Sequence, residues 1–237
     1  MEEIKTPQGS ALNITFTLKP GATAAKVELS PGQKFTAEGG AMIAMSSNIN
    51  LTTSTQQKKS GGFMKGLKRL FAGENFFLNH YTADSNGGTV WLGTTHMGDM
   101  DFKELNGDAL VLQGGAYVCS SEDIEIDASW QGFKSVVAKE SLFWIKATGK
   151  GTVVFNSFGS IYTIDVDGEH IVDTGHIVAF EESLSFTLTK AGKSWLSSVL
   201  GGEGIVCKFK GKGRVWVQSH NSNSFGNSLT PYLKPQN

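Results

Sequence analysis

The chain has 237 residues, of which 39% are hydrophobic and 18% are charged. This length and composition suit one large all-β domain or two small domains, and they exclude a disordered protein. Lys and Arg total 21 against 22 Asp and Glu, so the net charge of −1 gives no reason to expect nucleic acid as the main partner.

A turn of small residues is the first element that recurs along the chain. Each copy follows a glycine and an apolar strand, and each runs into a segment that alternates apolar and polar residues. Alternation with a period of two is typical of a half-buried β-strand. The copies of the turn and its flanks are Gly32–Met45, Gly107–Ser120 and Gly168–Phe180, and the alternating strands follow at Ile49/Leu51, Ile124/Ile126 and Leu184/Phe186/Leu188.

The second recurring element has the pattern Φ-x-x-Φ-Φ-x-x-Glu-x-Φ-Φ, where Φ is apolar. The i, i+3, i+4 spacing of its first part predicts one face of a short helix, and its last two apolar residues open a strand. Its copies are Leu67–Phe77, Phe133–Phe143 and Leu196–Val206.

The third element is a glycine followed by a β-branched and aromatic strand, at Gly88–Leu92, Gly151–Phe155 and Gly213–Val217. The order of the three elements is the same each time, which predicts a single domain with three internal repeats, at about 11–106, 107–167 and 168–219. Residues 220–237 are polar and are predicted to form a loosely held tail.

Each repeat has too few strands to bury both of its faces, so we expect the three to share one core. The predicted fold class is all-β, a closed or nearly closed pseudo-three-fold β-barrel or sandwich with short helical segments. Closure would protect strand edges that otherwise invite aggregation.

Four segments carry a resemblance to a known family. They are Glu38–Met45, Leu67–Glu74, Gly201–Gly204 and Gly213–Val217. The chain resembles the altered-inheritance-of-mitochondria family of mitochondrial biogenesis proteins from about Ala11 to His220. The resemblance implies a fold like that of the tryptophan RNA-binding attenuator protein, of the double-stranded β-helix type. It implies no established enzyme activity and no agreed ligand.

Location follows from the segments that the sequence lacks. Residues 1–9 are polar and are neither a secretory signal nor an Arg- and Ser-rich transit peptide, and no apolar run reaches the roughly 18 residues that span a bilayer. Cys119 and Cys207 are isolated thiols, which fits a reducing compartment, although folding could bring the two together. We expect a cytoplasmic protein, even though yeast relatives resemble proteins of the mitochondrial inner membrane.

Three repeated glutamates, Glu74, Glu140 and Glu203, are the first candidate site. Pseudo-symmetry could gather them around one axis, where they would bind a metal cation or another ligand and raise one another's pKa. The alternative, which we favour, is that each carboxylate accepts hydrogen bonds from backbone N–H groups at its own helix-to-strand junction.

The segment Gly61–Phe71 is the second candidate site, a basic amphipathic helix that could contact an anionic membrane or a protein partner. Core packing, as in the equivalent segments of the other repeats, is the interpretation we favour. The apolar and basic residues of this candidate surface are Phe63, Met64, Lys65, Leu67, Lys68, Arg69, Leu70 and Phe71.

No other motif favours catalysis. The sequence contains neither a G-x-S-x-G elbow nor a P-loop, and His96–Asp101 is too loose a cluster to define a metal site. Gly149–Gly151 and Gly211–Gly213 are interpreted as hairpin turns. Trp91 and Trp216, in equivalent strands, are predicted to fill the core.

The function therefore expected is that of a non-enzymatic interaction or assembly module without a cofactor, which forms a homo-oligomer or binds an unknown protein partner. A β-barrel that binds a small ligand or metal is the first alternative, and a peripheral membrane protein is the second.

Overall fold

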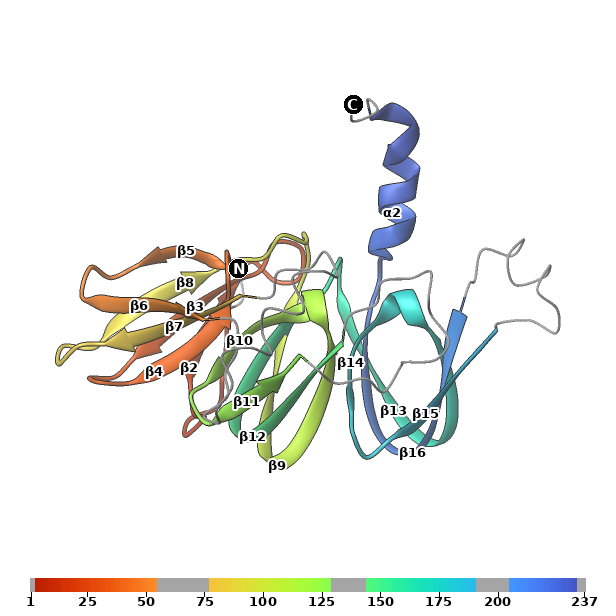
Figure 1. Cartoon of the computed structure of the whole chain (residues 1–237), viewed down its shortest axis with the longest axis horizontal. Coiled ribbons are helices and arrows are strands. Elements are labelled where there is room, and N and C mark those ends of the chain that lie inside the picture. Colours follow the sequence, from red (N-terminus) through yellow and green to blue (C-terminus); the bar gives the residue numbers. More distant parts are fainter. Residues whose placement is uncertain (1–2, 55–76, 129–143, 191–204, 234–237) are drawn as a thin grey trace.

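The computed structural model describes residues 3–54, 77–128, 144–190 and 205–233. These residues are mostly β-strand, which confirms the predicted all-β class. Three groups of strands lie side by side along the long axis, in chain order, and a helix projects from the body near the third group (Figure 1). We call the groups units 1, 2 and 3.

Unit 1 follows a short N-terminal hairpin and is built from short strands. The hairpin strands are β1 (Ile4–Lys5) and β2 (Asn13–Thr17). The strands of unit 1 are β3 (Ala24–Leu29), β4 (Lys34–Glu38), β5 (Met42–Met45), β6 (Ile49–Ser54), β7 (Leu78–Ala83) and β8 (Gly88–Leu92).

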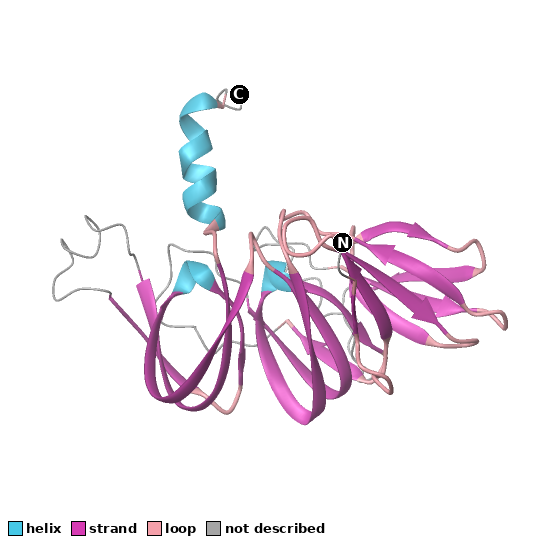
Figure 2. Cartoon of the chain, turned by 180° about the vertical axis from the view of Figure 1, so that it is seen from behind, coloured by secondary structure: helices cyan, strands magenta, loops and turns pink. Residues whose placement is uncertain are grey.

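Units 2 and 3 each contain two long strands, two short strands and one turn of 3-10 helix. Unit 2 consists of β9 (Met100–Gln113), η2 (Gly114–Ala116), β10 (Tyr117–Ser121), β11 (Ile124–Asp127) and β12 (Trp144–Asn156). Unit 3 consists of β13 (Ile161–Asp173), η3 (Thr174–His176), β14 (Ile177–Glu181), β15 (Ser185–Lys190) and β16 (Ile205–Gln218). Figure 2 shows η2 and η3 at the same edge of their two units.

The same strand pairing occurs in each unit. The long pairs β9·β12 and β13·β16 correspond to two shorter pairs in unit 1, β3·β8 followed by β4·β7. The next short strand also pairs antiparallel in each unit: β5 with β8, β10 with the C-terminal half of β12, and β14 with the C-terminal half of β16. Its register shifts each time at the same place, between Met42 and Ala44, Tyr117 and Cys119, and Ile177 and Ala179.

Neighbouring units are joined by strand pairing into one sheet of 11 strands. At the first seam, β10 of unit 2 pairs with β4 of unit 1, and at the second, β14 of unit 3 pairs with β9 of unit 2. The remaining strands β1, β2, β3, β8 and β5 form a separate sheet in that order, in which β5 is the last strand. Each seam is therefore a continuation of the backbone ladder.

The segments Gly149–Gly151 and Gly211–Gly213 are not hairpin turns, which corrects the prediction. They lie inside the continuous strands β12 and β16. Gly151 has a φ of +147°, and a Cβ there would lie 2.0 Å from the Ser121 hydroxyl oxygen. Only glycine fits at this position, where β12 bends close to β10. Because of the bend, the two halves of one long strand belong to two different parts of the sheet, which we call half-sheets.

The core is divided into three clusters, which corrects the expectation of one shared interior. The second cluster includes Leu105 and Leu110 from the two halves of β9, and neighbouring units contribute Leu78 of β7 and Val178 of β14. Trp216 is buried in that cluster as predicted, while Trp91 is only partly buried. Among the described strands, β13 and β6 end the 11-stranded sheet and do not meet.

Several sequence-based boundaries also differ from the structure. The repeat boundaries predicted at residues 107 and 168 fall inside β9 and β13. The polar tail contains a helix, α2 (Ser222–Leu229), followed by η4 (Thr230–Tyr232). Asn221 caps α2 by accepting a hydrogen bond from the Ser224 N–H at 3.1 Å, and no described residue of α2 is buried.

Candidate functional site

The strand β5 is an exposed apolar edge in unit 1. Its sequence is Met-Ile-Ala-Met, and all four residues are exposed. Met42, Ile43 and Met45 have relative exposures of 37%, 61% and 38%. In the described part of the chain β5 pairs with β8 alone. Such an edge offers both backbone hydrogen-bonding groups and apolar side chains to another strand.

The counterparts of β5 in the other two units are buried. The equivalent residues of unit 2, Tyr117–Ser120, are all 0% exposed, and those of unit 3, Ile177–Phe180, are at most 1% exposed. Both strands are covered because each pairs on its outer side with the preceding unit, β10 with β4 and β14 with β9. No described strand pairs with β5 on its outer side, so β5 has the apolar composition of β10 and β14 without their second partner.

A second exposed edge lies in unit 3. The long strand β13 ends the 11-stranded sheet, and among the described strands it pairs with β16 alone. Tyr162 and Ile171 on this strand are 54% and 60% exposed. Figure 1 places β5 in the left-hand unit and β13 in the right-hand unit. Among the described end strands, β5 and β13 are thus two open edges on unlike strands.

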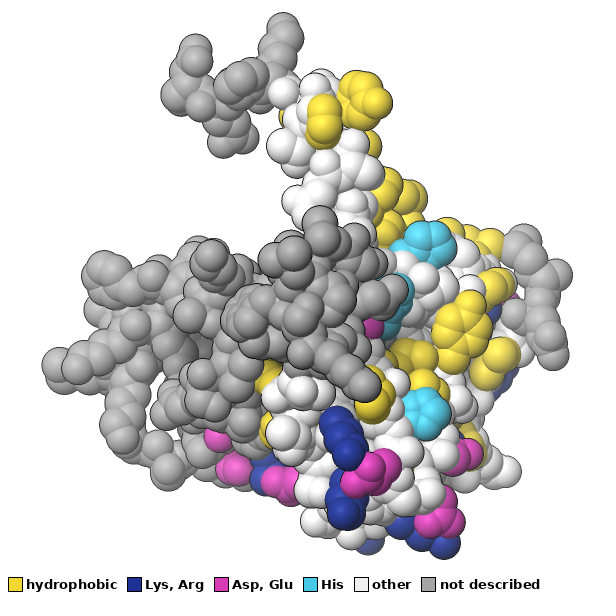
Figure 3. All heavy atoms as spheres, turned by 90° about the vertical axis from the view of Figure 1, so that its right-hand side faces the viewer, with side chains coloured by type: hydrophobic (Ala, Val, Ile, Leu, Met, Phe, Trp, Pro, Cys, Tyr) yellow, Lys and Arg dark blue, Asp and Glu magenta, His cyan; other side chains and the backbone are white. Residues whose placement is uncertain are grey.

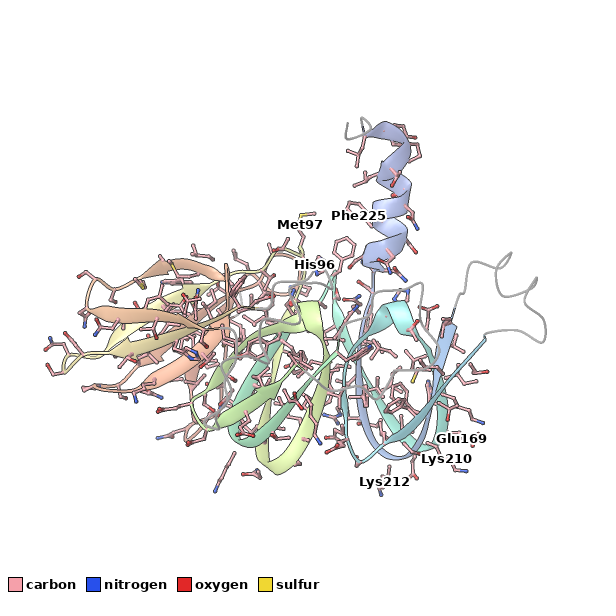
Figure 4. The ribbon with its side chains drawn as sticks, viewed as in Figure 1. His96, Met97, Glu169, Lys210, Lys212 and Phe225 are labelled. Atoms are coloured by element: carbon pink, nitrogen blue, oxygen red, sulfur yellow. The ribbon has the colours of Figure 1, made fainter. Side chains whose placement is uncertain are left out.

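Charged side chains face one another across the pair β13·β16. Asp165, Asp167 and Glu169 stand directly opposite Arg214, Lys212 and Lys210. The Arg214 Nε donates to Asp165 Oδ1 at 2.7 Å, and Lys208 Nζ lies 2.6 Å from Glu169 Oε2. These charges gather in the lower part of unit 3 (Figures 3 and 4).

The cross-strand pairs shift the titration of their members. The Arg214 guanidinium lowers the pKa of the Asp165 carboxyl through its hydrogen bond, and Lys208 lowers the pKa of Glu169 in the same way. The pKa of Arg214 is raised in turn by Asp165. Both acids are ionised at neutral pH, and the opposite charges fix the register of this exposed edge strand.

Aromatic rings gather where α2 leaves the body. Phe158 lies 5.8 Å from His96, 5.3 Å from His220 and 5.3 Å from Phe225, measured between ring centroids. Burial lowers the pKa of His96, so this imidazole is neutral at pH 7. Figure 4 shows His96, Met97 and Phe225 on one side of the molecule, away from Glu169 and Lys210. The rings pack the base of the helix against the body.

The loose cluster His96–Asp101 does not converge on a common centre. Asp99 is buried and lies 3.0 Å from Lys19 Nζ, and it accepts hydrogen bonds from Thr23 Oγ1 and the Met100 N–H. Asp101 instead accepts from the Phe102 N–H. Within residues 3–54, 77–128, 144–190 and 205–233, no group of three or more His, Cys, Asp or Glu side chains could hold a metal ion.

Both candidate sites from the sequence lie outside the described residues. This holds for the three glutamates, Glu74, Glu140 and Glu203, and for the basic amphipathic segment Gly61–Phe71. Sequence reasoning missed β5 because the three equivalent strands are all apolar, and only their pairing separates one from the others. Among the described residues, no helix has both the length and the apolar character needed to cross a membrane.

The two cysteines are free and buried. Burial raises the pKa of Cys207 to about 12 and raises the pKa of Cys119 still further. Both thiols therefore stay protonated at neutral pH and are poor nucleophiles.

Comparison with known proteins gives one family, and bacterial proteins are among the relatives. Residues 17–220 match the family model described as mitochondrial biogenesis AIM24. An uncharacterized protein of Streptococcus pyogenes serotype M6 is 27% identical over 214 residues, which are 88% of this chain and 86% of the relative. A crystal structure of a Streptococcus pyogenes protein, a structural genomics target, is 25% identical with a TM-score of 0.74 and covers 94% of this chain and 100% of its own.

Proposed function

Since the chain belongs to the mitochondrial biogenesis AIM24 family, whose biochemical function is not established, we propose that it is a non-enzymatic assembly module that associates with copies of itself. One observation carries the proposal. The exposed apolar strand β5 occupies the position that is buried under a neighbouring strand in units 2 and 3.

An uncovered edge of this kind is unusual in a monomer. Natural proteins protect sheet edges with charged residues, proline, bulges or covering segments, because an open edge pairs with other chains. The four residues of β5 include no charge and no proline, and three of them are large and apolar. The register shift in β5 also occurs in β10 and β14, which both pair with a further strand, so it does not block pairing. A partner that pairs with β5 would bury these side chains and satisfy the backbone groups on its outer side.

Light scattering during size-exclusion chromatography tests the proposal. The chain has a mass of 25.4 kDa, so self-association predicts a particle mass that is a multiple of this value. Met45→Lys should lower the particle mass, because the new charge would have to be buried against the partner.

Leu51→Lys is the matched control for that variant. Leu51 is 39% exposed against 38% for Met45, but it lies on β6, whose counterparts β11 and β15 take no part in either seam. The control should leave the particle mass unchanged. A strict monomer at high protein concentration would contradict the proposal.

The proposal extends to the origin and location of the chain. Three copies of one ancestral unit are supported by the register shift that recurs in β5, β10 and β14. A cytoplasmic location is supported by Cys119 and Cys207, which are unpaired as expected in a reducing compartment.

The two alternatives from the sequence stay predictions. The ligand or metal site at Glu74, Glu140 and Glu203 and the membrane or partner surface at Gly61–Phe71 fall on residues that the structure does not describe. No described contact favours either of them over self-association.

A further inference from the structure

We propose that copies of this chain associate head to tail, with β5 of one copy pairing antiparallel with β13 of the next, so that Ala44, Met45 and Ser46 stand opposite Val172, Ile171 and His170. The inference rests on the proposed self-association and adds which two edges meet and in which register. It follows from the two seams inside the chain.

We call the strand that the later unit contributes to a seam the donor strand, and it occupies the same position in both internal seams. In the first seam Cys119, Ser120 and Ser121 of β10 contribute the pairing, and in the second Ala179, Phe180 and Glu181 of β14 do so. These residues are the first three after the register shift that β10 and β14 share with β5. The equivalent residues of unit 1 are Ala44, Met45 and Ser46.

We call the strand of the earlier unit the acceptor strand, and its pairing position is also the same in both seams. Cys119 and Ala179 pair with Ala37 of β4 and Leu112 of β9. Leu112 is the last residue but one of β9 and stands opposite Ile145 of β12. Val172 is likewise the last residue but one of β13, and it stands opposite Cys207 of β16. Val172 is therefore the acceptor position of unit 3.

Exposure agrees with these assignments on both sides. The residues that pair in the internal seams on the acceptor side, Phe35–Ala37 and Leu110–Leu112, are at most 2% exposed. At the equivalent positions of unit 3, Ile171 is 60% exposed and His170 is also exposed, while Val172 is 7% exposed. Unit 3 thus carries an acceptor edge with which no described strand pairs.

The two edges are different surfaces, so their contact is heterologous. Such contacts generate a ring when the rotation between copies closes and a filament when it does not. Figure 1 shows the two edges in the first and the third unit, separated by unit 2, so one copy could contact two neighbours. Joining them would create a third seam of the same kind as the two within the chain.

Engineered disulfides test the pairing in the full-length chain. Residues directly opposite in an antiparallel pair have Cα atoms about 4.5–5.5 Å apart, which suits a disulfide. After mild oxidation, Met45→Cys/Ile171→Cys should give a ladder of cross-linked species, whereas a mixture of the two single variants should stop at linked dimers. The native thiols Cys119 and Cys207 are buried and should not contribute.

A cysteine pair out of register is the matched control. Tyr162 lies on the same strand as Ile171 and is 54% exposed, but it is nine residues away, about 30 Å along a strand. Met45→Cys/Tyr162→Cys should therefore give no ladder. Linked dimers from Met45→Cys alone would indicate a symmetric β5–β5 contact and would overturn the head-to-tail arrangement.

A charge exchange gives a second, reversible readout. Met45→Lys and Ile171→Glu should each raise the dissociation constant by at least about tenfold, because each places a lone charge in the seam. Mixing the two variants should restore the large assemblies, since every contact then joins either the introduced lysine to the introduced glutamate or the two native residues to each other.

The outcomes separate this inference from the proposed function. If the unmodified chain is a strict monomer in light scattering, both are wrong. If it forms oligomers but the cysteines introduced at Met45 and Ile171 do not cross-link and mixing the charged variants restores nothing, self-association stands and the β5–β13 pairing is overturned.

Discussion

Asp101 is a carboxylate whose surroundings oppose its charge. It lies on β9, and burial raises its pKa even though the Phe102 N–H donates to it at 2.9 Å. A raised pKa in the folded state means that folding favours the protonated acid, so the ionised form lowers stability at neutral pH. As the pH falls through this raised pKa, the penalty disappears.

Asp101→Asn is expected to raise the free energy of unfolding at pH 7, because the amide accepts the same hydrogen bond without a buried charge. The gain should shrink as the pH is lowered through the raised pKa of Asp101. Urea unfolding of both proteins at several pH values measures it.

Asp165→Asn is the control, with the opposite sign expected. The hydrogen bond from Arg214 lowers the pKa of Asp165, so its contribution to stability is present above the ordinary pKa and is lost as the pH falls through the lowered one. A gain at pH 7 from Asp165→Asn, or none from Asp101→Asn, would contradict this account.

Single residues also show what a sequence pattern can and cannot give. Trp216 was predicted to be buried and is buried, because an aromatic residue in a β-branched run has few other places in a β protein. Gly149 and Gly211 were misassigned to turns. Glycine with positive φ serves a hairpin and a bend within a strand equally well, and only the partner strand distinguishes the two.

At the scale of elements, alternation predicted β6, β11 and β15 correctly. Ile49, Ile124 and Leu184 are buried at or just before the start of these strands. In β11 the alternation continues with the buried Ile126, whereas Leu51 of β6 is 39% exposed. The helix α2 was missed because its sequence, Ser-Asn-Ser-Phe-Gly-Asn-Ser-Leu, has only the i, i+4 pair Phe225 and Leu229 as an apolar face and contains a glycine. That pair and the cap at Asn221 are the local signals that could have found it.

A chain that ends at Asn221 tests how much α2 contributes. The helix buries no residue, and its contact with the body is the packing of Phe225 on Phe158. An eight-residue helix is only marginally stable alone, and an aromatic pair contributes about 1 kcal/mol, so the truncation should lower the free energy of unfolding by about 1 kcal/mol.

Chemical denaturation of the truncated chain measures this contribution, with Phe209→Ala as a positive control. Phe209 is 0% exposed in the third core cluster, and its loss should be larger, about 3–5 kcal/mol. A loss of that size on truncation would mean that α2 is part of the folded core.

At the scale of the whole molecule, the order of units was predicted and their mutual arrangement was not. The three recurring elements predicted strands in the right places, but an apolar strand carries no mark of which neighbour covers it. Tyr117–Ser120 and Met42–Met45 are alike in sequence character and opposite in exposure. Seam pairing, which decides between the two, depends on position in the row of units.

Equivalent substitutions in an internal seam and at the open edge should therefore have different effects. Ser120→Lys places a charge in a position that is 0% exposed, and it should lower the free energy of unfolding by about 3 kcal/mol or more. Met45→Lys, at the equivalent exposed position, should leave the stability of the monomer within about 0.5 kcal/mol of the parent.

Denaturant unfolding at low protein concentration separates the two effects, because Met45→Lys can then act only within the monomer. If Met45→Lys destabilised the isolated chain as much as Ser120→Lys, β5 would be covered by the chain itself, and the edge would not be available to a partner.

The bend that carries each long strand from one half-sheet into the next has a consequence for how such chains can evolve. Under the proposed β5–β13 pairing, every unit would pair through one edge with the unit before it and through another edge with the unit after it. Duplication within a gene and association between molecules would then extend the same sheet, and the two would differ only in whether a peptide bond joins neighbouring units.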